Sequence, residues 1–71
     1  MFTLYSVDGE IKKRAGMSLK EAQEFVGGYI EVVGDVICNE DGKHLGLDKN
    51  KERPEFVGNI IVGNINRFDS V

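Results

Sequence analysis

Residues 18–47, SLKEAQEFVGGYIEVVGDVICNEDGKHLGL, decide the fold of this chain. The stretch begins as a short capped helix, because Ser18 and Glu21 have the Ser-x-x-Glu spacing of a capping box. Its apolar side chains recur at helical spacing and form one stripe, made of Leu19, Ala22, Phe25 and Val26. A pair of glycines follows, and glycine readily adopts the left-handed conformation that ends a helix. We therefore expect a helix over residues 18–26 that packs its stripe on a sheet.

Three β-segments follow the helix, at residues 29–33, 36–40 and 43–47. The first two are separated by Gly34-Asp35, which has glycine first, as in a type II′ hairpin turn. The last two are separated by Asp41-Gly42, a strong signal for a two-residue hairpin. The stretch predicts an antiparallel meander of three adjacent strands, in a register that the tight turns determine.

The chain before the helix predicts a further strand. Residues 2–7 alternate with period two, and Asp8-Gly9 is a turn signal. Residues 10–14 then form either the hairpin partner of this strand or a solvated loop.

The chain after the meander is first polar and then apolar. Pro54 excludes the middle of a strand, so residues 48–55 predict a short helical turn or a loop. Residues 56–62 are apolar enough for a strand inside the sheet, and residues 65–71 add a short end strand or a frayed terminus. The predicted fold class is α+β, with one short helix packed on a mainly antiparallel sheet of four to five strands. A chain of 71 residues allows one domain, over residues 1–71.

Composition restricts the classes of function. The chain is 41% hydrophobic and 30% charged, as in globular proteins. One cysteine excludes an internal disulfide, and one cysteine with one histidine leaves a zinc site short of ligands. No apolar run reaches the ~20 residues of a membrane span, and the N-terminus lacks the order of a secretory signal. We expect a cytoplasmic protein with no membrane partner and no cofactor. So small a domain often gains stability by self-association, so we also expect a homo-oligomer.

Charge is distributed unevenly along the chain. Residues 1–20 hold four lysines and arginines against two acidic residues, a balance of +2. Residues 21–42 hold six acidic residues and no lysine or arginine, a balance of −6. Contact with nucleic-acid phosphates needs clustered cations, so this distribution disfavours a nucleic-acid partner.

The residues with reactive side chains lack catalytic surroundings. His44 follows a predicted turn, and a general base would need a nucleophile or an orienting carboxylate beside it. Cys38 lies in a predicted strand among apolar neighbours and is expected to pack as a small hydrophobe. Residues 48–52 lack the glycine and glutamate that a calcium loop requires at its sixth and twelfth positions. We expect no catalytic residue, no metal site and no enzymatic activity.

The middle of the chain resembles a domain-of-unknown-function family of small proteins from phages, plasmids and other mobile elements. The resemblance rests on VGGYIEVV at residues 26–33, NEDGK at residues 39–43, LGL at residues 45–47 and Asn50. It covers roughly residues 19–50, and residues 57–63 are similar to the closing strand of that family. The chain departs from the family at residues 48–53, where relatives usually carry prolines and then an arginine. The resemblance implies an accessory protein of the host cytosol and no known activity.

Most residues that the resemblance emphasises have structural explanations as helix stops, strand starts or turns. Glu31 does not, because a carboxylate in the middle of a strand must be exposed or paired. The neighbour of Glu31 across the sheet is Cys38 or Asn39, depending on the register. The candidate partner- or ligand-binding residues are Tyr29, Glu31, Asn39, Lys43 and Asn50.

Three functions follow from these observations. The first is a non-enzymatic phage or mobile-element accessory protein that acts by protein–protein binding, with a protein partner or a second copy of itself. The second is a small-molecule or nucleotide-binding protein that sequesters its ligand against host defence. The third is a nucleic-acid-binding protein.

Overall fold

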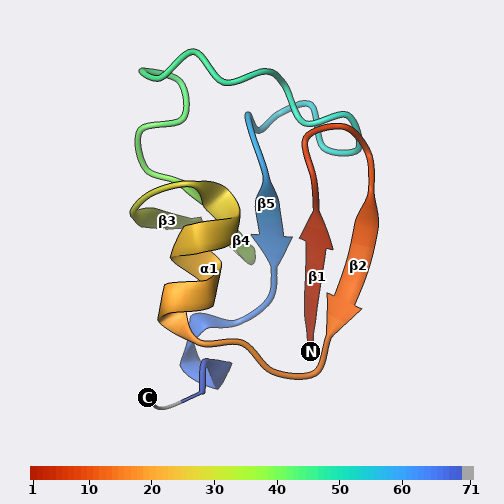
Figure 1. The fold of residues 1–71 in the computed structure, drawn as a ribbon, viewed down its shortest axis with the longest axis vertical. Coiled ribbons are helices and arrows are strands. Elements are labelled where there is room, and N and C mark those ends of the chain that lie inside the picture. The colour runs from red at the N-terminus through yellow and green to blue at the C-terminus, as the bar shows by residue number, and fades with distance from the viewer. Residues whose placement is uncertain (70–71) are drawn as a thin grey trace.

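One α-helix packs on a five-stranded antiparallel sheet in the computed structural model, which describes residues 1–69 (Figure 1). The strands are β1 (Phe2–Tyr5), β2 (Ile11–Arg14), β3 (Ile30–Val33), β4 (Val36–Asn39) and β5 (Ile60–Val62). The helices are α1 (Leu19–Val26) and the 3-10 helix η1 (Ile65–Arg67). The spatial order of the strands is β2-β1-β5-β4-β3, and every neighbouring pair is antiparallel. The predicted fold class is confirmed.

The predicted capping box begins α1. The Ser18 hydroxyl accepts from the Glu21 N–H at 3.1 Å, and the Glu21 carboxylate accepts from the Ser18 N–H at 3.0 Å. Gly27 ends the helix in the left-handed conformation, with φ 86°. The predicted apolar stripe is wrong at Leu19, which is 44% exposed, because the fully buried side chain at this end of the helix is Met17.

A hairpin forms at the N-terminus, between β1 and β2, and the predicted hairpin at Gly34-Asp35 forms between β3 and β4. Gly34 has φ +64°, and Asp35 is not in the positive-φ region, as a type II′ turn between β3 and β4 requires. The glycine is needed here because other residues adopt this φ only under strain. Residues 10–14 contain β2, so the hairpin alternative for this segment is confirmed and the solvated loop is not.

The third strand of the predicted meander is wrong. Residues 40–46 form consecutive turns, and β5 takes the place beside β4. The Asp41-Gly42 signal fails because the Asn39 side chain accepts from the Asp41 N–H at 2.8 Å, which turns the chain before a hairpin can close. Neither Asp41 nor Gly42 has a positive φ, which both would need in a type I′ turn.

The closing strand lies inside the sheet, between β1 and β4, as predicted, although it begins at Ile60 and not at residue 56. The segment at residues 48–55 is a loop, and a single bridge joins Lys49 to Val57. In place of the predicted end strand, the chain forms η1 and an isolated parallel bridge between Ser18 and Asp69. The end of that prediction, residues 70–71, lies outside the described residues.

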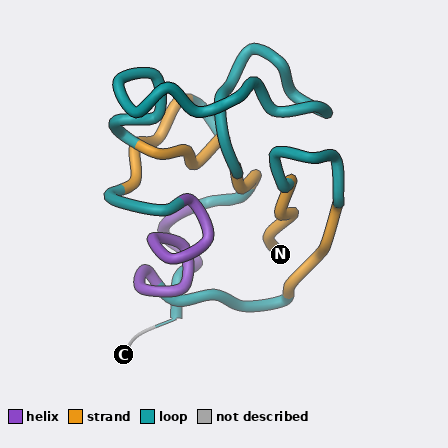
Figure 2. The backbone as a smooth tube through the Cα atoms, turned by 45° about the horizontal axis from the view of Figure 1, so that its top comes forward, coloured by secondary structure: helices purple, strands orange, loops and turns teal. Residues whose placement is uncertain are grey.

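The sheet has two differently covered faces. One face packs on α1 and forms a core cluster of Phe2, Leu4, Met17, Ala22, Val26, Ile37 and Ile61. The opposite face carries a second cluster of Val36, Cys38 and Ile60, against which Tyr5, Phe56 and Val62 pack. The long connection between β4 and β5 runs across one end of the sheet toward the β1–β2 turn (Figures 1 and 2). Within residues 1–69, no helix has the length and apolar character needed to cross a membrane.

Candidate functional site

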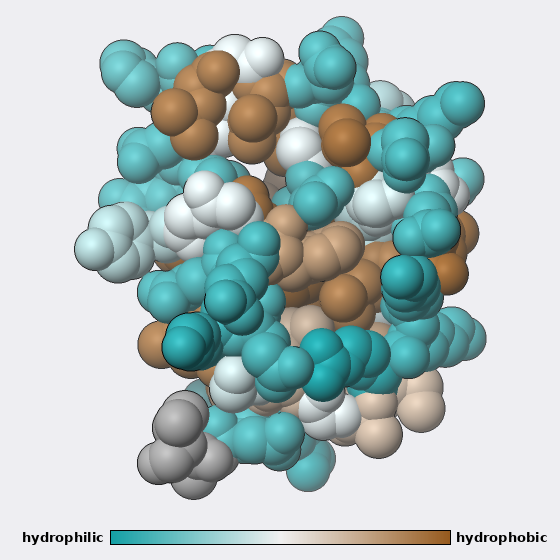
Figure 3. All heavy atoms as spheres, viewed as in Figure 1, coloured by the Kyte–Doolittle hydropathy of each residue, from teal (hydrophilic) through white to brown (hydrophobic). Residues whose placement is uncertain are grey.

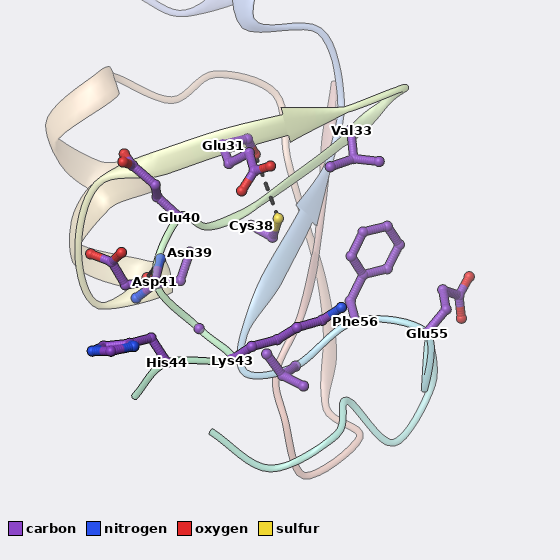
Figure 4. Close-up of a pocket in the computed structure, with 12 residues that line it drawn as sticks. Glu31, Val33, Cys38, Asn39, Glu40, Asp41, Lys43, His44, Glu55 and Phe56 are labelled. Carbon is purple, nitrogen blue, oxygen red and sulfur yellow. Dashed lines mark hydrogen bonds between the residues drawn. The ribbon is translucent and has the colours of Figure 1, made fainter. Parts of the chain in front are cut away.

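A groove of about 620 Å³ lies on the sheet face opposite α1, between the β3–β4 hairpin and the β4–β5 connection (Figure 4). Its apolar lining consists of Val33, Cys38, Phe56 and Val57. Its ionisable lining consists of Glu31, Glu40, Asp41, Glu55, Lys43 and His44. We call this site the acidic groove, because its lining holds four carboxylates and one lysine.

The β3–β4 hairpin positions one wall of the acidic groove. Glu31 and Val33 lie two residues apart on β3 and therefore project from the same face of the sheet. The register pairs Glu31 with Cys38, which settles the neighbour that the sequence left open. The Cys38 thiol lies 3.6 Å from the Glu31 carbonyl oxygen (Figure 4).

The end of the β4–β5 connection supplies the other wall. The Phe56 carbonyl accepts from the Asn50 N–H at 2.8 Å, and the Phe56 N–H donates to the Arg53 carbonyl at 2.9 Å. Val57 approaches Gly42 so closely that a Cβ on Gly42 would lie 2.8 Å from the Val57 side chain. Glycine at residue 42 therefore allows the two ends of the connection to meet, a role different from the hairpin turn that its sequence suggested.

The carboxylates of the acidic groove are largely uncompensated. In the described part of the chain, Glu31, Glu40 and Asp41 form no ion pair, and Glu55 alone is paired, with Arg53 at 3.0 Å. The pKa of Glu55 lies below its ordinary value, because its own backbone N–H and then the Arg53 guanidinium stabilise the carboxylate. The groove therefore presents a negative potential above an apolar lining.

The thiol and the imidazole do not form a reactive pair. Burial, and secondarily the negative charge of Glu31, raises the pKa of the Cys38 thiol above its ordinary value. The nucleophilic thiolate is therefore scarce at neutral pH. His44 is exposed and points away from Cys38 in Figure 4. Over residues 1–69, no three His, Cys, Asp or Glu side chains are grouped to hold a metal ion.

A family model described as a domain of unknown function, DUF3846, matches residues 3–69. The chain belongs to the DUF3846 family. The match extends beyond the resembling stretches to include β2, η1 and all of β1 except Phe2. Neither the curated proteins nor the solved structures contain a match to this chain. The family is described as one of unknown function, so the side chains of this DUF3846 domain are what indicate its role.

The five candidate residues of the sequence separate into two groups in the DUF3846 domain. Glu31, Asn39 and Lys43 line the acidic groove. Tyr29 is 73% exposed at the start of β3 and lies outside the groove lining. Asn50 is fully buried and is a structural residue of the connection.

The Asn50 side chain satisfies backbone groups on three segments. Its amide donates to the carbonyl oxygens of Tyr5 at 3.1 Å and Gly58 at 2.9 Å. Its carbonyl accepts from the N–H groups of Glu52 at 3.0 Å and Arg53 at 3.1 Å. A buried amide with all these partners has no capacity left for a ligand.

Asn39 also has a structural task, although it lines the groove. Its amide donates to the Val26 carbonyl at 3.0 Å, and the Asn59 amide donates to the Phe25 carbonyl at 2.9 Å. Asn39 in β4 and Asn59, just before β5, thus satisfy carbonyls at the end of α1 that have no partner within the helix.

Sequence reasoning missed Glu55, Phe56 and Val57 as groove residues. They lie more than twenty positions after Glu31, and only the course of the β4–β5 connection brings them to the same face. No local pattern in the sequence indicates that approach. The connection also carries exposed apolar side chains such as Leu45, and hydrophobic surface gathers at the end of the molecule where it runs (Figure 3).

Proposed function

We propose that this DUF3846 domain is a non-enzymatic accessory protein of a phage or another mobile element, which acts in the host cytosol by binding another protein. The acidic groove is the binding site in this proposal. The observation that carries it is an apolar lining beside unpaired carboxylates on an exposed sheet face.

Each part of the groove contributes differently to such binding. Val33, Phe56 and Val57 offer apolar surface whose removal from water favours association. The carboxylates of Glu31, Glu40 and Asp41 attract a partner of opposite charge and select its orientation. The partner is therefore expected to be basic where it meets the groove.

A charge-reversal pair tests this proposal. Glu31→Lys changes the groove, whereas Glu24→Lys makes the same change at an exposed position on α1. Proteins retained from host cytosol by the immobilised domain are identified, purified and titrated against both variants by calorimetry. We expect Glu31→Lys to weaken binding by about tenfold or more and Glu24→Lys to leave it unchanged. Equal loss in both variants, or no loss in either, contradicts the groove as the site.

A small-molecule ligand is the second candidate function. The groove volume of about 620 Å³ falls within the range of ~300–1,000 Å³ typical of ligand pockets. Its carboxylates would repel the phosphates of a nucleotide, so the observation favours a cationic or uncharged ligand. A thermal-shift panel of polyamines and nucleotides separates the cases, since a ligand that binds the native state raises the melting temperature.

Self-association of the domain remains a prediction. Light scattering coupled to sizing chromatography over a range of protein concentrations measures the mass directly. A mass that stays at one chain, 7.9 kDa, at all concentrations contradicts the expected homo-oligomer.

A further inference from the structure

The outer edge of β3 is open. β3 is the last strand of the sheet, and its only strand neighbour among the described residues is β4. The Tyr29 carbonyl accepts from the Glu40 N–H at 2.9 Å. In an antiparallel pair, residues bonded to the partner strand alternate with residues whose N–H and C=O point away from it. Ile30 and Val32 therefore direct their backbone groups outward, where another strand can bond them.

The two edges of the sheet differ in their protection. β2, at the opposite edge, has the sequence IKKR, and all four of its residues are exposed. Lysines on an edge strand discourage the addition of another chain. β3 lacks cations and leaves Val32 43% and Val33 46% exposed. An exposed apolar edge of this kind invites pairing with an extended segment.

The open edge is continuous with the acidic groove. Glu31 and Val33 line the groove and belong to β3 itself. A strand added to β3 would place its own side chains about 4.5–5.5 Å from these residues on the groove face. A long cationic side chain opposite Glu31 would then extend over the groove toward the unpaired carboxylates of Glu40 and Asp41.

We propose that the occupant of this site is an extended basic segment of a partner protein, which adds to the β3 edge as a sixth strand. Every second side chain of this segment lies on the groove face. On that face, a lysine or arginine lies opposite Glu31 and an apolar residue lies opposite Val33. Main-chain hydrogen bonds to Ile30 and Val32 hold the segment on the edge, and the carboxylates of the acidic groove select a segment with cationic side chains. This inference rests on the proposed function and specifies the chemistry of the partner.

The probe is a short blocked peptide with the repeat Lys-Thr-Val-Thr, which presents lysine and valine in turn on one face of a strand, titrated into the intact domain and followed by NMR. We expect the amide signals of residues 30–33 to shift and the exchange of the Ile30 and Val32 amides with solvent to slow. Two matched peptides separate the contributions. One has glutamate in place of lysine, and one is N-methylated at all of its backbone nitrogens so that neither of its edges can donate a main-chain hydrogen bond. Both should bind at least about tenfold more weakly than the probe.

A matched pair of protein variants complements the peptides. Val32→Pro removes an outward N–H that the sheet does not use, which an edge strand tolerates, whereas Glu31→Gln removes charge and keeps the backbone. Both variants should weaken the binding of the probe peptide, and Glu24→Gln on α1 should leave that binding unchanged. If Val32→Pro does not fold, the N-methylated peptide still tests the backbone pairing in the wild-type domain.

The outcomes distinguish this inference from the proposed function. If N-methylation has no effect while a natural partner still depends on Glu31, strand addition is wrong and the groove function stands. If neither the peptide nor a natural protein partner responds to groove variants, both are wrong. If the β3 edge is occupied by a second copy, shown by concentration-dependent mass that Val32→Pro abolishes, the basic-partner inference is overturned.

Discussion

The two faces of the sheet are closed by different kinds of chain. On one face α1 buries Phe2, Met17 and Ile37 completely. On the other, the irregular β4–β5 connection leaves Glu31 and Val33 exposed beside the acidic groove. A helix satisfies most of its own backbone groups and offers a continuous apolar stripe, whereas an irregular segment needs side chains to satisfy its backbone. Incomplete cover by the connection is therefore the physical origin of the groove.

The largest expected effect is on the helix-covered face. Phe2→Ala removes a fully buried ring that also stacks on Phe68, with ring centroids 5.5 Å apart. Loss of the buried surface and the resulting cavity should lower the free energy of unfolding by about 3–5 kcal/mol. Urea unfolding measures the change, with Ile11→Ala on the exposed edge as the control. A milder Phe2→Leu keeps the comparison measurable if the alanine variant is unfolded. Equal effects at Phe2 and Ile11 would mean that this face is not the core.

The next effect tests how the connection is held over the other face. Asn50→Ala leaves the buried Gly58 carbonyl and the Arg53 N–H without a partner. Each buried polar group left without a partner costs about 1–3 kcal/mol, so the free energy of unfolding should fall by at least this amount. Hydrogen exchange should also accelerate in residues 49–58. Asn66→Ala, at an exposed site in η1, is the control and should change stability little. Unchanged exchange in Asn50→Ala would show that the connection is held by other contacts.

A smaller effect is expected at the start of α1. Ser18→Ala removes the side chain that accepts from the Glu21 N–H. Loss of an N-cap typically costs about 1 kcal/mol, which in this case weakens the helix that covers the sheet. Chemical unfolding gives the magnitude, and Ser18→Asp, which retains a capping oxygen, should recover most of the loss. Failure of the aspartate variant to recover stability would point to a packing role for Ser18.

The smallest effect depends on pH. The Ser18 N–H, and then Arg14 at 2.8 Å, holds the pKa of Glu21 below its ordinary value of 4.5. Because the folded pKa is lowered, the stabilisation is present above pH 4.5 and is lost as pH falls through the folded pKa. Glu21→Gln keeps the capping geometry but loses this charge. The stability difference between wild type and Glu21→Gln should therefore shrink on acidification from neutral pH, as measured by urea midpoints. A difference that stays constant down to pH values below the folded pKa would contradict the assignment, and Glu24→Gln serves as the control.

The accuracy of sequence reasoning varied with the range of the interactions. The capping box of Ser18 and Glu21 and the Gly34-Asp35 turn were predictable, because each depends on contacts between near neighbours. The third strand at residues 43–47 was not, since Asp41-Gly42 competes with the Asn39 side chain, which also bonds α1. Three of the five candidate residues line the groove, whereas Asn50 is buried in the connection, where its bonds to distant segments leave no local pattern in the sequence.

By itself, the sequence determined the helix, the β3–β4 hairpin and the position of a buried closing strand, because periodicity and turn chemistry act over a few residues. The tertiary structure alone decided which strand lies beside β4 and which side chains meet Glu31 across the groove. Those outcomes depend on where a connection of twenty residues, from Glu40 to Asn59, finds partners for its backbone. Such partners lie on distant segments, so no local pattern records them.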